Sequence, residues 1–163
     1  VNEAKVMGFF FGDGSCGTNT WSLNNANIQY LDKMASLCPF DTRIYSTMES
    51  SGVYKLNAIG DVKTISLRYR SLFYNAANEK VIPPCILNAP KEVVKAFVEG
   101  YYMTDGDIKG KEGSMGMFIL GKRLGYNVSI NTRSDKPDIY RQTWTTSSQR
   151  KEPCAIKKLE FLE

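Results

Sequence analysis

The sequence predicts an α+β fold of two related halves, about residues 1–88 and 89–163, within a single domain spanning 1–163. The first observation is a nine-residue pattern that occurs twice, as VMGFFFGDG at 6–14 and VEGYYMTDG at 98–106. The copies align without a gap, and each matched pair, such as Asp13 and Asp105, lies 92 positions apart. The second observation is that helical and strand-like periodicities alternate after each copy. Together they predict the order helix, two strands, helix, two strands, helix (αββαββα) in each half, with irregularities.

Both copies of the pattern have the features of a helix that stops at a glycine. In the second copy, apolar residues recur at helical spacing, Pro90 suits the first turn and Gly106 suits the C-terminal cap. In the first copy, Gly8 and Gly12 lie four residues apart on one face, where glycine lowers helix propensity. The second copy repeats this face of small residues. We therefore predict a central pair of helices whose backbones approach closely.

The rest of the first half alternates between strands and helices. Trp21 and Leu23 alternate with polar residues, as in a half-buried strand. The next apolar stripe has helical spacing and is closed by Pro39. The elements expected here are a hairpin at 15–25, a helix at 27–37, strands at 43–48 and 52–59, and a helix capped by Asp61 that runs to about residue 74.

The second half is expected to depart from the first in two places. The segment after Asp105 is short and rich in Gly and Lys, so its first hairpin is expected to be reduced. No helix of normal length is expected after the last strand. The other elements expected are a helix at 115–124 and strands at 126–131 and 139–146, joined through 134–137.

The duplicated Asp-Gly ending carries the candidate chemistry. Asp13 and Asp105 are expected at helix C-termini, where the helix dipole disfavours negative charge. Two carboxylates brought together there should recruit divalent cations that prefer oxygen ligands, Mg²⁺ above all. A single helix ending in Asp-Gly is ordinary turn chemistry. The matched pair makes a catalytic arrangement the favoured interpretation.

The two nonapeptides resemble the paired motifs of LAGLIDADG homing endonucleases, in the form that carries two motifs in one chain. Two further segments, KVIPPCILNAP at 80–90 and GYNVSINTRSDKPDIYRQT at 125–143, resemble endonuclease domains inserted in inteins of B-family DNA polymerases. The resemblance covers most of the chain. It implies two pseudo-symmetric LAGLIDADG halves, in which antiparallel strands form a saddle over the central helix pair. It also implies a monomer that cuts double-stranded DNA at a long, asymmetric site.

The resemblance further implies a shared centre for two or three divalent ions, with Mg²⁺ expected and Mn²⁺ or Ca²⁺ able to substitute. Asp13 and Asp105 are then the catalytic, metal-binding acids, and Gly12 and Thr104 supply nearby backbone carbonyls. Lys80 is expected close to the metal-bound water. Its counterpart in the second half stays open among three lysines, Lys151, Lys157 and Lys158.

Polar residues on the predicted strands form the expected DNA-binding face. Arg and Asn side chains match the edges of guanine and adenine in the major groove, and Lys mostly holds phosphates. For any single residue, a solvated strand face is the alternative. The candidates are Thr20, Ser22, Asn24, Arg43, Lys55 and Asn57 in the first half, and Asn127, Ser129, Asn131, Arg133, Arg141 and Thr143 in the second.

Composition excludes several classes of protein. A chain of 163 residues with a net charge of +4 and 12% aromatic residues can bury a core and is no disordered basic tail. No apolar run reaches membrane-spanning length and no signal peptide is visible, so no membrane partner and an intracellular location are expected. The four cysteines show neither metal-ligand spacing nor a disulfide framework, so reduced thiols are expected.

The absence of histidine excludes Ser-His-Asp and Cys-His catalysis and zinc sites built on histidine. The absence of histidine also argues against protein splicing by this chain, because inteins are known to use histidines in the splicing reaction. Because the chain begins with Val and its first helix begins almost at once, we expect a fragment of a larger protein.

Three interpretations compete. The first is an active double-strand endonuclease, and the second is a DNA- or RNA-binding LAGLIDADG relative without cleavage, either maturase-like or a degenerate intein insert. The third is a structural domain in which the acids serve only as helix caps. Both acids are intact, which favours the first.

Overall fold

The computed structural model describes residues 1–104 and 106–146. Its first half contains α1 (Asn2–Asp13), β1 (Gly14–Cys16), β2 (Trp21–Asn25), α2 (Ile28–Leu37), β3 (Thr42–Thr47), α3 (Met48–Ser51), β4 (Val53–Ala58) and α4 (Val62–Phe73). Helix α5 (Pro84–Leu87) ends this half, and the second half contains α6 (Lys91–Tyr101), β5 (Ile108–Lys109), α7 (Lys111–Arg123), β6 (Asn127–Thr132) and β7 (Ile139–Thr145).

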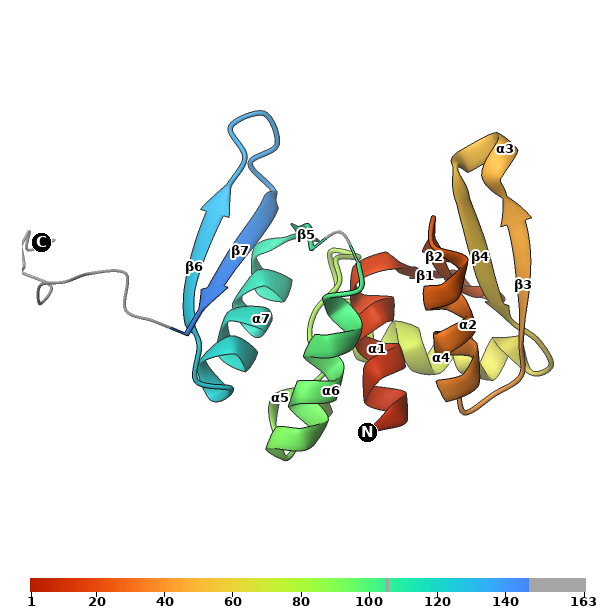
Figure 1. The fold of residues 1–163 in the computed structure, drawn as a ribbon, viewed down its shortest axis with the longest axis horizontal. Coiled ribbons are helices and arrows are strands. Elements are labelled where there is room, and N and C mark those ends of the chain that lie inside the picture. Colours follow the sequence, from red (N-terminus) through yellow and green to blue (C-terminus); the bar gives the residue numbers. More distant parts are fainter. Residues whose placement is uncertain (105, 147–163) are drawn as a thin grey trace, which may run out of the picture.

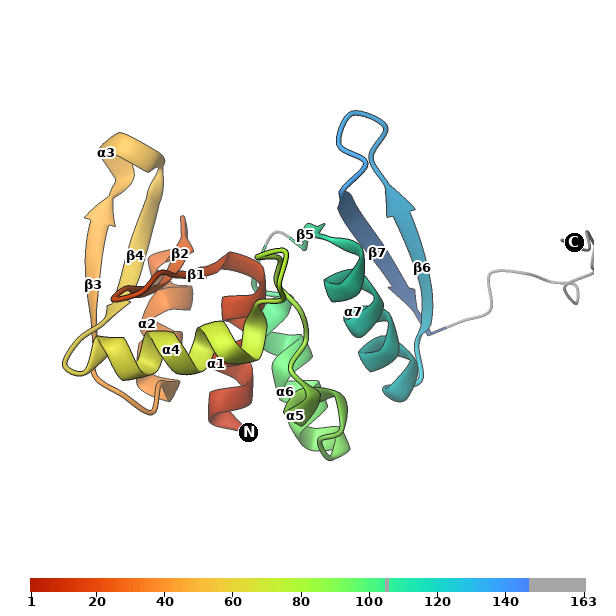
Figure 2. The same ribbon diagram turned by 180° about the vertical axis from the view of Figure 1, so that it is seen from behind.

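The elements form an α+β fold with two antiparallel sheets on either side of a helix pair (Figures 1 and 2). The strand order is β1-β2-β4-β3 in one sheet and β5-β7-β6 in the other. Helices α1 and α6 run side by side between the sheets, with their C-terminal ends on the same side (Figure 1). The hairpins β3–β4 and β6–β7 rise on either side of those ends. The predicted fold class is therefore confirmed.

The contact between α1 and α6 repeats itself under the 92-residue offset. A Cβ atom on Gly8 would overlap the carbonyl oxygen of Phe97, and a Cβ atom on Gly100 would overlap the carbonyl oxygen of Lys5. Gly8 matches Gly100 and Lys5 matches Phe97 at that offset, so the two contacts are equivalent. The prediction of two backbones in close approach at small residues is confirmed.

Aromatic side chains fill the core of the first half around Phe10. Its ring centroid lies 5.8 Å from that of Trp21, 4.8 Å from Tyr69 and 5.1 Å from Phe73. All four side chains are fully buried. This cluster joins α1 to β2 and α4, and so fixes the direction in which the C-terminal end of α1 points.

Several element boundaries differ from the sequence prediction. Helix α6 ends at Tyr101 rather than at a cap on Gly106, because its last turn tightens: Met103 N–H donates to the Gly100 carbonyl and Thr104 N–H to that of Tyr101. Helix α7 begins four residues earlier than predicted, and the short helix α3, which interrupts the β3–β4 connection, was not predicted.

The first hairpin of the second half is reduced, as predicted, to the two residues of β5. The absence of a final helix falls on residues 147–163, outside the described chain. Cys16, Cys38 and Cys85 are free thiols, and Cys154 lies outside the described residues. Among the described residues, no helix has the length and apolar character needed to cross a membrane.

Candidate active site and nucleic-acid interface

Asp13 is the last residue of α1, and strand β2 holds it in place. The Asn24 side-chain amide donates to the Asp13 backbone carbonyl, and the Asn25 side-chain amide donates to Asp13 Oδ2, each at 3.0 Å. The backbone and the carboxylate are therefore both fixed by neighbouring residues at the end of one strand. Asn25 was missed in the sequence, where the signal was its place beside Asn24 at the end of a predicted strand.

Lys80 caps the C-terminal end of α1. It follows α4 in a segment whose backbone pairs with Tyr74. Its ammonium group donates to the carbonyl oxygens of Phe10 at 2.8 Å and Phe11 at 3.2 Å, and also to that of Gly14. The last carbonyls of a helix have no partner within the helix, and a cation there offsets the negative end of the dipole. Lys80 thus fixes the end of the helix that carries Asp13.

The environment of Lys80 alters its acidity. Burial lowers the pKa of its ammonium group to about 8, and the negative charge of Asp13 opposes this shift. Burial disfavours the charged form of an amine, so the charge is maintained only by the carbonyl oxygens and the nearby carboxylate.

The ends of the two motifs meet at the helix pair. A Cβ atom on Gly12 would overlap the Thr104 side chain, so these two equivalent residues lie against each other. Thr104 Oγ1 donates to the Tyr101 carbonyl at 2.6 Å. Asp105, the second predicted acid, lies outside the described residues, as do Lys151, Lys157 and Lys158.

The donor atoms around Asp13 suit a hard divalent cation. A carboxylate and backbone carbonyls are the oxygen ligands that Mg²⁺ and Ca²⁺ prefer. Within residues 1–104 and 106–146, no three His, Cys, Asp or Glu side chains gather into a metal-binding cluster. Asp13 is thus the one member of the predicted acid pair that the described chain contains.

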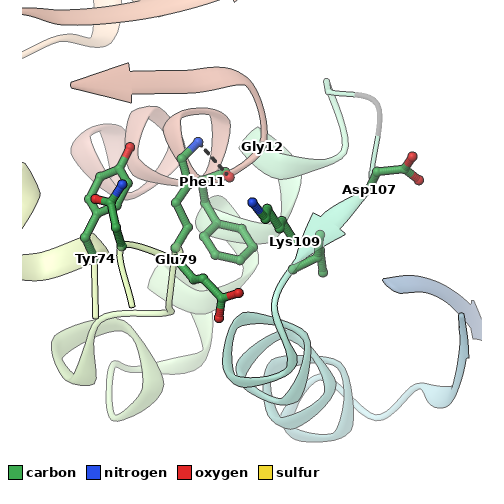
Figure 3. A pocket seen from close by; sticks show the side chains of 9 residues that line it. Phe11, Gly12, Tyr74, Glu79, Asp107 and Lys109 are labelled. Atoms are coloured by element: carbon green, nitrogen blue, oxygen red, sulfur yellow. Dashed lines mark hydrogen bonds between the residues drawn. The ribbon is translucent and has the colours of Figure 1, made fainter. Parts of the chain in front are cut away.

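A cavity of about 240 Å³ lies beside Lys80 and is lined by residues of both halves (Figure 3). Glu79 comes from the first half, and Asp107 and Lys109 come from the segment that follows the second motif. Neither Asp107 nor Lys109 was singled out in the sequence. The lining residues are Phe11, Gly12, Tyr74, Asn78, Glu79, Lys80, Asp107, Ile108 and Lys109.

The polar residues predicted for the first half share one face of its sheet, which we call the first polar face. In the strand register, Ser22 and Arg43 both lie opposite Asn57, so the three side chains form one row across β2, β4 and β3. Asn24 and Lys55 lie opposite each other in the next row. The other face carries the buried side chains Leu23 and Leu56. This face comprises Thr20, Ser22, Asn24, Arg43, Lys55 and Asn57.

Two members of this face make hydrogen bonds within the chain. Thr20 precedes β2, and its hydroxyl accepts a hydrogen bond from the Gly17 N–H at 3.0 Å. One N–H of the Asn24 side-chain amide donates to the Asp13 carbonyl, so this residue also supports the end of α1.

The polar residues predicted for the second half also share one face of their sheet, which we call the second polar face. Ser129 lies opposite Thr143 and Asn131 lies opposite Arg141 across β6 and β7, and all four are exposed. The intervening residues Val128 and Trp144 pack toward α7 at Gly121. This face comprises Asn127, Ser129, Asn131, Arg133, Arg141 and Thr143.

Both predicted arginines of the second polar face form ion pairs. Arg133 lies just beyond β6, and its guanidinium donates to both oxygens of Asp135, at 3.0 and 2.7 Å. Arg141 donates to both oxygens of Asp107, at 2.7 and 3.3 Å. The hydrogen bond from Arg141 lowers the pKa of the Asp107 carboxyl.

The known sequences similar to this chain include two DNA polymerases. One, from Acanthamoeba polyphaga mimivirus, is 42% identical over 185 aligned positions that cover 98% of this chain and 11% of the polymerase. The other, from Thermococcus hydrothermalis, is 26% identical over 122 positions that cover 67% of this chain and 7% of the polymerase. The chain therefore spans about a tenth of the length of these curated relatives. No protein-family profile matches it.

Comparison with solved structures gives homing endonucleases. Mesophilic variants of I-DmoI superpose with a TM-score of 0.61 at 13% identity, over 88% of each chain. I-DmoI in complex with DNA and Ca gives a TM-score of 0.59 at 12% identity, over 88% of this chain and 82% of that one. I-WcaI bound to its DNA recognition sequence gives 0.54 at 16% identity, over 86% of this chain and 74% of that one. The chain has the fold of these LAGLIDADG homing endonucleases.

Proposed function

We propose that this chain is a LAGLIDADG homing endonuclease that hydrolyses both strands of double-stranded DNA at one long, asymmetric site. The observation that carries the proposal is that two sheets, each with a polar face, lie on either side of the helix pair α1 and α6 (Figure 1). Small-molecule sites are concave and mostly apolar. Extended rows of Asn, Ser, Thr, Lys and Arg instead suit the phosphates and base edges of a duplex.

The two faces divide the recognition task between them. Arg43 and Asn57 share one cross-strand row of the first polar face, and Arg141 and Asn131 share one row of the second. An arginine next to an amide presents the donors and acceptors that distinguish guanine from adenine in the major groove. Because the two faces differ in sequence, each reads a different half-site.

The catalytic proposal assigns metal binding to Asp13 and Asp105, with the carbonyls of Gly12 and Thr104 nearby. Divalent ions held there would lower the pKa of a bound water and stabilise charge on the phosphate. Asn24 and Asn25 keep Asp13 oriented toward the site. Lys80 holds the end of α1 in place through three carbonyls, and burial lowers its pKa to about 8, within reach of proton exchange near neutral pH.

The wider context that we propose is an insertion in a DNA polymerase, as in inteins. The support is the mimivirus DNA polymerase, in which the region similar to this chain is a small part of a much longer protein. The domain proposed to act as one unit is the whole of residues 1–163, working as a monomer.

The direct test is cleavage of a plasmid library with random inserts. With Mg²⁺ or Mn²⁺ present, we expect cuts at one sequence family without twofold symmetry, and none after the metal is chelated. Sequencing of the cut ends gives the site. Selective DNA binding without cleavage under either metal would overturn the endonuclease proposal and favour the non-cleaving relative.

A further inference from the structure

The ion pair between Asp107 and Arg141 lies within a cross-strand row of the second sheet. Ile108 of β5 pairs with Tyr140 of β7, which brings the preceding residue, Asp107, next to Arg141. Arg141 in turn lies opposite Asn131 of β6. The carboxylate therefore lies on the second polar face, at the edge nearest the segment that follows the second motif.

The contact uses one edge of the guanidinium and leaves the other edge open. Asp107 Oδ1 accepts from Nε at 2.7 Å and Oδ2 accepts from Nη2 at 3.3 Å. A guanidinium has five N–H donors in a rigid plane, so Nη1 and the second hydrogen of Nη2 still point outward. That outer edge matches O6 and N7 of guanine, the most frequent specific contact of arginine with DNA. The Arg141 side chain is 58% exposed, so the edge is accessible.

We propose that Asp107 is a positioning residue for base recognition: it holds Arg141 so that its outer edge reads one guanine in the second half-site. This inference rests on the proposed DNA-binding function. An arginine held by a carboxylate has lost part of its rotamer freedom before DNA arrives, so less entropy is lost on binding. A fixed plane also rejects bases that a mobile side chain would accommodate.

The equivalent position in the first half supports a role in recognition over a role in folding. Ser15 is the counterpart of Asp107 at the 92-residue offset, and its hydroxyl lies 3.1 Å from that of Ser22. The Arg43 side chain forms no hydrogen bond or ion pair within the described residues. The second half thus carries an acid where the first half carries a neutral hydroxyl. Exposed ion pairs add little stability, so this acid contributes little to the fold.

The test measures base preference directly. Binding sites are selected from a randomised duplex pool with Mg²⁺ omitted, for the parent, Asp107→Ala, Arg141→Ala and the matched control Asp138→Ala. Asp138 is an exposed acid in the β6–β7 connection whose side chain has no hydrogen bond or ion pair among the described residues. A bidentate contact to guanine discriminates by roughly 5- to 150-fold. We expect Asp107→Ala to lose about fivefold or more of that preference.

The loss in Asp107→Ala should fall on the same base pair as in Arg141→Ala, and Asp138→Ala should keep the parental preference. Parental preference in Asp107→Ala would overturn the inference while leaving the proposed function intact. An equal loss at every base pair would also overturn it, since that outcome indicates a structural role. Failure of the parent to select any sequence would instead refute the proposed function itself. Thermal melting of Asp107→Ala, expected to match the parent, confirms that folding is not the cause.

Discussion

The two halves share one helix interface but support their motifs in different ways. In the first half, β2 holds Asp13 through Asn24 and Asn25, and Lys80 fixes the end of α1. In the second half, α6 ends at Tyr101, the position equivalent to Phe9 in α1. The two-residue strand β5 takes the place of the hairpin β1–β2. The segment after the second motif is tied to β7 by strand pairing and by the Asp107–Arg141 ion pair.

The difference shows which parts of a duplicated fold must stay symmetric. At Gly8 and Gly100 the facing backbone leaves no space for a side chain, and both copies of the motif have glycine there. The supports around each motif can differ, because each has only to hold one helix end. Such divergence agrees with the proposal that the two polar faces read unlike half-sites.

The largest expected effect is on catalysis and should be the same for both halves. Asp13→Asn and Asp105→Asn should each reduce cleavage by at least ~10³-fold, which is about 4 kcal/mol in the activation barrier. In the proposed mechanism each acid holds metal at a shared centre, and loss of one negative charge near phosphate should leave DNA binding intact. Single-turnover cleavage and binding titrations measure the two effects. Cleavage at the parental rate in either variant would show that the centre is not shared.

The next effect tests the symmetry of the helix interface. Gly8→Leu and Gly100→Leu should both destabilise the fold by more than ~3 kcal/mol, because the added side chain meets backbone that cannot move aside. Gly17→Ala is the control, since its Cβ would meet only the end of the Thr20 side chain, at 2.9 Å. Urea unfolding gives the free energies. If one glycine tolerates leucine and the other does not, the interface is not equivalent in the two halves.

Much of the fold and part of the candidate site could be predicted from the sequence. The helix pair was predictable because its contact depends on residue type: only small residues permit it. The polar faces were predictable because alternation along a strand fixes which side chains share a face. The Asp107–Arg141 pair was not, because it depends on the register of a two-residue strand with a strand about thirty positions away. The early end of α6 was not predictable either, because it depends on one tightened turn, whereas the repeated motif suggests that α6 ends at the same position as α1.

A smaller effect concerns Lys80, whose three candidate counterparts in the second half, Lys151, Lys157 and Lys158, lie outside the described residues. The folded protein releases the Lys80 proton near pH 8, whereas the unfolded chain holds it until about pH 10.5. Between these values the unfolded state binds more protons, so this residue makes the free energy of unfolding rise with pH. Lys80→Met should remove that rise. Urea unfolding of both proteins at pH 7, 8, 9 and 10 tests this, and parallel pH profiles would contradict it.

The smallest effect separates the arginines of the two polar faces. The Arg43 guanidinium has no hydrogen-bond or ion-pair partner among the described residues, whereas that of Arg141 is held by Asp107. Arg43→Lys should therefore change base preference by less than ~3-fold, and Arg141→Lys should remove a bidentate contact worth ~1–3 kcal/mol. Competition binding with single-base variants of the selected site gives both numbers. Equal losses in the two variants would show that the carboxylate makes no difference.

The central claim is that one chain supplies both unlike halves of the interface. Analytical ultracentrifugation of the protein on its selected duplex measures this directly, as the mass of the complex. The account predicts one protein per duplex, on a site whose halves are unrelated in sequence. Two proteins bound to a palindromic site would contradict it.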